Sequence, residues 1–283
     1  MERFTNDGYS FDVTETHAAD GSSTGQACVL LRGFPEDRRC WDAVTPALAG
    51  AGYRVLAPDL RGYSAGARPA ARRAYTLSRL AGDVLALADA AGVERFHVVG
   101  HDWGAALAWY LAGHHPSRLI SLCALSVPHP EAFLRALTGS SQALRSWYMV
   151  AYQVPGLPEL ALSRRGGRAM RAALMRTGLD PANAGRYAAR AADRAALRGP
   201  LNWYRAMPFG LRDRTDRIDV PTLFVWSGGD RFICRAAAEL CGRYVDGPYR
   251  FEILGGASHW LPEETPEQVT ALLIQHFARV ASS

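Results

Sequence analysis

Three side chains have the types and spacing of a covalent catalyst, namely Asp102, Asp230 and His259. Asp102 is the centre of Gly-His-Asp-Trp-Gly over residues 100–104, a G-x-nucleophile-x-G pattern in which small flanking residues allow a sharp turn that exposes the central side chain. A carboxylate at this place predicts nucleophilic attack and a covalent intermediate. His259 would then activate water as a general base, with Asp230 orienting its ring.

Each of these residues, taken alone, has an ordinary structural explanation. The two glycines around Asp102 could simply allow a helix to pack closely on a strand. An aspartate after two glycines, as at Asp230, is typical of a turn that satisfies its own backbone. His259 could be a hydrogen-bonded loop histidine. Their order along the chain and their places after separate strands favour one shared site instead.

The elements that must position these residues alternate between strands and helices. Apolar and β-branched runs predict strands over 27–31, 53–59, 96–99, 119–127, 222–226 and 249–254. Apolar residues at helical spacing, together with small-residue runs, predict helices over 41–49, 76–91, 105–111 and 266–280. This alternation predicts an α/β fold with a parallel sheet. Asp102, Asp230 and His259 each follow a predicted strand.

The chain between the strands 119–127 and 222–226 is too long for a simple connection. Roughly ninety residues lie there, whereas connections in compact domains usually have about 4 to 6 residues. Their composition favours helices. The sequence therefore predicts a helical lid over residues 130–216, inserted into a main domain formed by residues 1–129 and 217–283.

Composition excludes several other classes of protein. The 283 residues are 48% hydrophobic and 21% charged, which is typical of a globular chain with a sizeable core. The net charge is +5, but the arginines are scattered and no basic stripe interleaves with aromatic residues, so nucleic-acid binding is not expected. The five cysteines form no CxxC or Cys/His cluster, so we expect no metal site and buried thiols in a reducing compartment. The N-terminus has no apolar signal core and no apolar run could cross a membrane, so we expect a cytoplasmic protein.

Four segments, taken together, carry a family resemblance. They are Gly-Phe-Pro at 33–35, Gly-His-Asp-Trp-Gly-Ala at 100–105, the pair Ser-Trp-Tyr-Met at 146–149 and Asn-Trp-Tyr-Arg at 202–205, and Ser-His-Trp at 258–260. Over nearly its whole length the chain resembles the soluble, aspartate-nucleophile epoxide hydrolases of the α/β-hydrolase superfamily. The resemblance implies an α/β-hydrolase fold, a mostly parallel twisted sheet flanked by helices, with an inserted helical lid.

The resemblance also implies a reaction and a role for each site residue. Asp102 would attack an epoxide carbon and form an alkyl ester, which water activated by the His259/Asp230 pair would hydrolyse to a vicinal diol. Tyr148 and Tyr204 would donate protons or hydrogen bonds to the epoxide oxygen, although an isolated tyrosine is more often a packing residue. The backbone N–H groups of Phe34 and Trp103 would form the oxyanion hole. No metal or organic cofactor is implied.

The expected partner is a small-molecule substrate, an apolar epoxide that is bulky or aromatic, because aromatic and thioether side chains recur in the lid. The predicted pocket residues are Phe34, Trp103, His129, Trp147, Trp203, Met207 and Trp260. A role in detoxification and one in natural-product biosynthesis are equally open. The particular epoxide, the regioselectivity and stereoselectivity, and the oligomeric state, with a homodimer as one option, are not predicted.

One departure from the family pattern leaves two alternatives open. Relatives have His-Gly-X-Pro where this chain has Arg32 before Gly33 and Phe34. Our hypothesis is that an acidic or carbonyl partner accommodates Arg32 and that activity survives; otherwise the chain would be a ligand-binding relative that has lost turnover. A haloalkane or haloacid dehalogenase is the other alternative, since Asp102, Trp103 and His259 would also suit halide displacement. Against it, Phe34 stands where many dehalogenases of this type have a halide-binding Asn.

Overall fold

The computed structural model describes residues 1–210 and 214–282, and these form one eight-stranded sheet in the order β1-β2-β4-β3-β5-β6-β7-β8. The strands are β1 (Arg3–Asn6), β2 (Tyr9–Thr16), β3 (Ala27–Leu31), β4 (Arg54–Pro58), β5 (Phe96–His101), β6 (Leu119–Leu125), β7 (Thr222–Ser227) and β8 (Tyr249–Leu254). From β4 to β8 all neighbouring strands are parallel. The predicted α/β fold with a mostly parallel sheet is therefore confirmed, and each predicted strand is present.

The sequence did not predict the antiparallel edge of the sheet. Strands β1 and β2 pair with each other through a turn at Asp7 and Gly8, and β2 pairs antiparallel with β4. Both strands alternate buried and exposed positions and contain many polar residues, because one of their faces is open to solvent. The central strands β3, β5 and β7 are buried at every position and gave the clear apolar runs.

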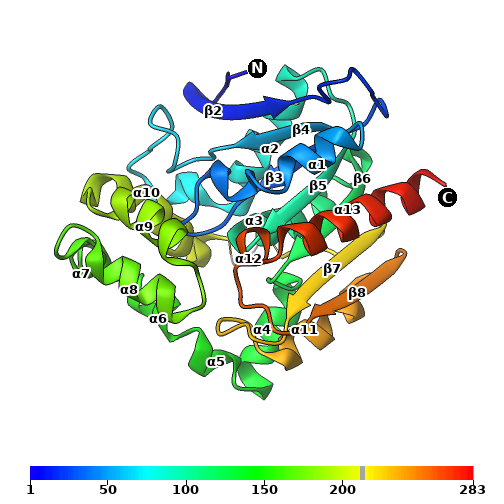
Figure 1. Cartoon of the computed structure of the whole chain (residues 1–283). Helices are drawn as coiled ribbons and strands as arrows, with labels where there is room; N and C mark the ends of the chain where they lie inside the picture. Colours follow the sequence, from blue (N-terminus) through cyan, green and yellow to red (C-terminus); the bar gives the residue numbers. More distant parts are fainter. Residues whose placement is uncertain (211–213, 283) are drawn as a thin grey trace.

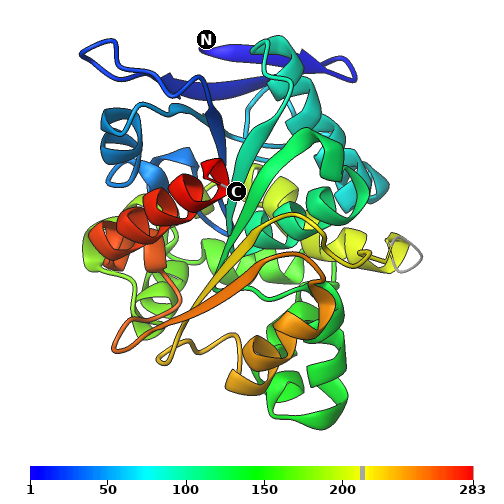
Figure 2. The same cartoon turned by 90° about the vertical axis from the view of Figure 1, so that its right-hand side faces the viewer.

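Helices cover both faces of the sheet. The helices of the main layer are α1 (Thr45–Gly50), α2 (Leu77–Ala90), α3 (Trp103–His114), α11 (Arg235–Leu240), α12 (Leu261–Glu264) and α13 (Pro266–Ala281). Figures 1 and 2 show α1 and α13 on one face and α2 and α3 on the other. Each face has its own hydrophobic core, with Leu80 and Leu107 in one and Leu48 and Leu273 in the other.

Short 3₁₀ turns complete the connections of the described residues. They are η1 (Arg38–Trp41), η2 (Arg72–Tyr75), η3 (Pro116–Arg118), η4 (Met207–Phe209) and η5 (Cys241–Tyr244). The helix predicted over 41–49 is in fact η1 followed by α1. Asp37 explains the difference, because its side chain accepts a hydrogen bond from the Arg39 N–H and so starts a helical turn early.

The long connection between β6 and β7 is helical. It contains α4 (Pro130–Gly139), α5 (Gln142–Arg145), α6 (Trp147–Ala151), α7 (Leu157–Ser163), α8 (Arg168–Arg176), α9 (Pro181–Ala191) and α10 (Arg194–Ala206). Figure 1 shows α6 to α10 gathered beside one end of the sheet. Residues 211–213 of the predicted lid lie outside the described residues.

Close backbone contact fixes α10 to the rest of the molecule. A Cβ on Gly199 would lie 2.4 Å from the Cα of Gly62, and the reverse substitution would clash equally with Gly199. The Trp203 indole N–H donates to the Arg61 carbonyl at 2.8 Å. These contacts fix the position of α10 against the loop that contains Arg61 and Gly62.

Candidate active site

The turn that carries Asp102 is tight because two glycines meet there. Asp102 lies between β5 and α3 with a φ of +51°, in the region that residues other than glycine rarely adopt. A Cβ on Gly100 would lie 2.2 Å from the Gly104 carbonyl oxygen, and one on Gly104 would lie 2.1 Å from that of Leu31. Such strain at a strand-to-helix turn is typical of a nucleophile elbow.

Both oxygens of the Asp102 carboxylate have partners. The Phe34 N–H donates to Oδ1 at 2.7 Å, and Nε2 of His259 lies 3.4 Å from Oδ2. Residue 33 has to be glycine, since a Cβ there would lie 2.3 Å from the Cβ of Asp102. Trp103 follows Asp102 directly and is the first residue of α3. Its backbone N–H therefore has no acceptor within the helix.

His259 is held between two carboxylates. Its Nδ1 lies 2.8 Å from Oδ2 of Asp230, which follows β7. The other oxygen of Asp230 accepts the N–H groups of Phe232 at 2.7 Å and Ile233 at 2.9 Å, which fixes the carboxylate. The three residues predicted from the chain order therefore meet in one hydrogen-bonded line from Asp102 through His259 to Asp230.

The pKa values of Asp102 and His259 are shifted in opposite directions. Burial favours the neutral form of Asp102, but hydrogen bonding and charge from His259, with smaller help from His101 and the Phe34 N–H, outweigh it and lower the pKa. Burial also disfavours charged His259, yet the Asp230 carboxylate and the hydrogen bonds to Asp102 and Asp230 raise its pKa to about 10. At neutral pH the resting site holds an aspartate anion beside an imidazolium.

Glu36 is a structural residue of this site that the sequence did not reveal. It is fully buried, and its Oε2 accepts the Gly33 N–H at 2.6 Å. Its Oε1 lies 2.8 Å from Nδ1 of His101, whose Nε2 lies 2.8 Å from the carbonyl oxygen of His259. Glu36 and His101 thus connect the turn of Phe34 to the loop of His259, on the side facing away from the cavity.

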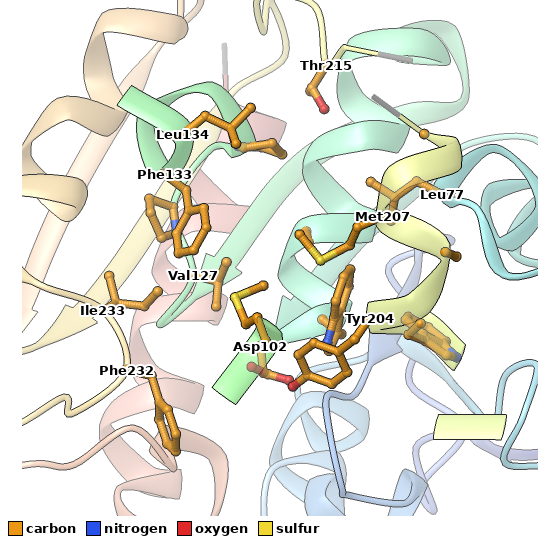
Figure 3. Close-up of a pocket in the computed structure, with 18 of the residues that line it drawn as sticks. Leu77, Asp102, Val127, Phe133, Leu134, Tyr204, Met207, Thr215, Phe232 and Ile233 are labelled. Atoms are coloured by element: carbon orange, nitrogen blue, oxygen red, sulfur yellow. The ribbon is translucent and has the colours of Figure 1, made fainter. Parts of the chain in front are cut away.

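Three tyrosines from the β6–β7 connection face the Asp102 turn. Tyr148 on α6 and Tyr204 on α10 have ring centroids 6.0 Å apart, and Figure 3 shows the hydroxyl end of Tyr204 directed toward Asp102. The ring centroid of Tyr152, on the turn that follows α6, lies 5.1 Å from that of Tyr204 and 5.7 Å from that of Phe34. Burial, with the Asp102 charge, raises the pKa of Tyr148 and Tyr204 well above their usual value and that of Tyr152 to about 12. All three are neutral donors at physiological pH.

A largely apolar cavity of about 200 Å³ opens above the Asp102 carboxylate. Figure 3 shows it extending from Asp102 and Tyr204 toward Leu134 and Thr215. Its apolar lining includes Leu77, Trp103, Val127, Phe133, Leu134, Met149, Trp203, Met207, Phe232 and Ile233, and its polar end includes Asp102, Tyr148, Tyr204 and His259. Trp103, Trp203 and Met207 therefore line the cavity as predicted.

Two predicted pocket residues, Trp147 and His129, do not line the cavity. Trp147 is 69% exposed on the outer side of α6, while its neighbours Tyr148 and Met149 line the cavity. His129 is fully buried beneath the cavity, where its Nε2 lies 3.1 Å from the Asp216 carbonyl oxygen and its ring stacks on Tyr244.

Two further predicted pocket side chains, those of Trp260 and Phe34, are not part of the cavity lining. The Trp260 indole N–H donates to the Thr177 hydroxyl at 3.1 Å, so the ring packs behind His259. The Phe34 ring packs against Tyr204 and Tyr152 and is not among the cavity's lining residues. Of Phe34, the backbone N–H is what meets Asp102.

Arg32 has a carbonyl partner and an aromatic one. The side chain is fully buried, and its Nη1 donates to the Gly33 carbonyl at 3.2 Å. The guanidinium carbon lies 3.1 Å from the centroid of the Tyr63 ring and 5.4 Å from that of Trp203. We had expected an acidic or a carbonyl partner for Arg32. The hydrogen-bond partner in the structure is a carbonyl.

The described residues contain neither a cluster of metal-binding side chains nor a helix able to span a membrane. Residues 1–210 and 214–282 contain no group of three or more His, Cys, Asp or Glu side chains arranged to hold a metal ion. Within the same residues, no helix has the length and apolar character needed to cross a bilayer.

Known proteins resemble this chain along nearly its whole length. Residues 27–266 match the alpha/beta hydrolase fold family. Epoxide hydrolase A of Mycobacterium tuberculosis is 34% identical, over 90% of this chain and 91% of that protein, and the AB hydrolase superfamily protein YfhM of Bacillus subtilis is 34% identical over 93% and 94%. The crystal structure of epoxide hydrolase A from Mycobacterium thermoresistibile superposes with a TM-score of 0.79 at 28% identity, covering 97% of this chain and 96% of that one. The chain therefore belongs to the alpha/beta hydrolase fold family and, within it, to the branch of the epoxide hydrolases.

Proposed function

We propose that this protein hydrolyses a small apolar epoxide to a vicinal diol, with Asp102 as the nucleophile. The observation that carries the proposal is the Asp102 carboxylate itself, ionised on a strained turn between a backbone donor and His259, at the polar end of an apolar cavity. Relatives whose names specify epoxide hydrolysis support the same reaction.

The first step joins the substrate to the enzyme. Oδ2 of Asp102, the oxygen that Phe34 does not hold, attacks one epoxide carbon, and the carbon–oxygen bond of the ring breaks as the ester bond forms. The ring oxygen receives the electron pair and a proton donated through the hydroxyls of Tyr148 and Tyr204. Their raised pKa values keep these hydroxyls protonated until charge develops on that oxygen.

The second step releases the diol. Water loses a proton to Nε2 of His259 and attacks the Asp102 carboxyl carbon, and the carbonyl electron pair moves to Oδ1. The Phe34 and Trp103 N–H groups stabilise that oxyanion. Collapse breaks the bond from the carboxyl carbon to Oδ2, which leaves as an oxygen of the diol and takes the proton from His259.

His259 has to lose its resting proton before it can act as a base. Esterification removes the negative charge of Asp102, and that charge contributes to the raised pKa of His259. We infer that formation of the ester lowers this pKa, so that the imidazolium passes its proton, through water, to the tyrosine oxygen that gave a proton to the epoxide oxygen. The imidazole is then neutral at the stage where a base is needed, and the tyrosine is a hydroxyl again. Asp230 keeps the ring in place throughout.

The shape of the site also suggests the substrate class and the domain roles. The cavity volume and its aromatic and thioether lining suit a compact apolar epoxide, aromatic ones included. We propose that residues 130–216 act as the lid of a main domain formed by 1–129 and 217–283, because Tyr148 and Tyr204 come from that insertion.

Trapping the ester tests this proposal. A His259→Gln variant mixed with styrene oxide should gain the full mass of the epoxide, since ring opening expels no atom, and peptide mapping should place the adduct on Asp102. Asp102→Asn is the matched control and should gain no mass. Absence of an adduct in the His259→Gln protein, with the native chain inactive on several epoxides, would refute the proposal. Halide release from a chloroalkane would favour the dehalogenase alternative instead.

A further inference from the structure

The peptide group between Gly33 and Phe34 is hydrogen-bonded at both ends. Its N–H, on Phe34, donates to Oδ1 of Asp102 at 2.7 Å. Its carbonyl, on Gly33, accepts from Nη1 of Arg32 at 3.2 Å and from the Tyr63 hydroxyl at 3.3 Å. The N–H that donates to Asp102 and the carbonyl that accepts from Arg32 therefore belong to the same peptide group, and resonance couples them.

The charge on Arg32 is buried without a carboxylate in contact. The side chain is 0% exposed, and the ion pairs among the described residues include none of its nitrogens. Its Nε and Nη2 have no hydrogen-bond partner. Tyr63 and Trp203 enclose the guanidinium and hold it in one position. In such a low-dielectric place a cation acts strongly on the polar group it touches.

We propose that Arg32 is a positioning residue that polarises the Gly33–Phe34 peptide and so strengthens the Phe34 N–H as an oxyanion donor. A cation at the carbonyl oxygen draws electron density from the amide, which makes the N–H more positive. Arg32 would therefore act on Asp102 through the peptide rather than by touching the substrate. This inference rests on the proposed two-step function.

The two steps should respond to this donor in opposite directions. Alkylation removes negative charge from the Asp102 carboxylate, so a stronger Phe34 N–H stabilises the starting state and slows that step. Hydrolysis places negative charge on Oδ1, so the same donor stabilises the transition state and speeds it. A residue that merely maintained the fold of the turn would, on removal, slow both steps.

Single-turnover kinetics with styrene oxide separate the two steps. In Arg32→Met we expect ester hydrolysis to slow about tenfold, a fraction of the ~10²- to 10³-fold lost with a whole oxyanion donor, while alkylation is unchanged or faster. The ester should then accumulate at steady state in intact-protein mass spectra. Tyr63→Phe keeps the ring beneath the guanidinium and removes the neutral donor to the same carbonyl, so it should slow hydrolysis by a smaller factor.

A second variant distinguishes loss of the Arg32 charge from misfolding. Arg32→His, assayed at pH 8.5 where a histidine is ordinarily neutral, should show the same opposite effects, and circular dichroism establishes that each variant is folded. Equal slowing of both steps, or hydrolysis at the native rate, would overturn the inference while leaving ester chemistry intact. Failure of any chain, the His259→Gln variant included, to form an ester would overturn the proposed function and this inference with it.

Discussion

Replacing Asp230 with Asn should remove most of the pH dependence that His259 gives to the stability of the fold. The pKa of His259 is raised from 6.5 to about 10, first of all by the Asp230 carboxylate acting against burial. A group with a raised pKa in the folded state contributes its full stability below pH 6.5, and this contribution is lost as the pH rises toward 10. Native protein should therefore become less stable through that interval.

The shift gives the expected size of the effect. A histidine with pKa about 10 when folded and 6.5 when unfolded changes the free energy of unfolding by about 4 kcal/mol between pH 6 and pH 9.5. No correction for solvent screening is needed, since the side chain is 2% exposed. In Asp230→Asn, only the Asp102 charge would counteract the lowering of the His259 pKa by burial. We therefore expect the free energy of unfolding to change by about 2 kcal/mol or less over the same pH interval.

Urea unfolding followed by tryptophan fluorescence at pH 6 and pH 9.5 measures both values. His259→Gln is the control, because it lacks the titrating group but retains the buried tyrosines and cysteines that titrate at high pH. If native protein loses no more stability across this interval than His259→Gln does, then His259 is not an imidazolium in the folded resting state. The resting site would then hold a neutral imidazole beside Asp102 and no ion pair.

Four further substitutions test other contacts of the site. Tyr204→Phe should slow alkylation by about 10²-fold in single-turnover kinetics, the usual worth of general acid catalysis, whereas Tyr152→Phe should change it little. Gly33→Ala should abolish activity, since the added Cβ would lie 2.3 Å from that of Asp102; normal turnover would contradict the described turn. Glu36→Gln keeps an acceptor for the Gly33 N–H but loses its charge beside a buried histidine, so urea unfolding should show a loss of about 1 to 3 kcal/mol.

The elbow, together with Asp230 and His259, was predictable from the sequence because backbone sterics and chain order restrict where these residues lie. The contacts at Gly100 and Gly104 allow no side chain, so a glycine pattern after an apolar strand indicates the turn and hence Asp102. Parallel strands end at one edge of the sheet, which brings Asp230 and His259 there as well. These features depend on local geometry and chain order, both of which the sequence contains.

The pocket was harder to predict because it depends on which way short helices face. Helix α6 has five residues, too few for its periodicity to show that Tyr148 faces inward and Trp147 outward. Trp260 adjoins His259 in sequence, yet it turns toward Thr177. Glu36 resembles an ordinary turn carboxylate, and its burial follows from His101, which is remote in sequence. Each of these placements is decided by tertiary contacts.

The charge of Asp102 connects the two halves of the proposed cycle. While the carboxylate is ionised, it acts together with Asp230 to keep His259 protonated, and it accepts the Phe34 N–H, so the site stores an ion pair and no base is available to activate water. Esterification cancels that charge, which frees the imidazole to accept a proton and leaves the oxyanion donor beside a neutral carbonyl that is ready to gain charge. Premature water activation is thus prevented by the same carboxylate whose alkylation enables it, and the order of the two steps follows from electrostatics without any movement of the backbone.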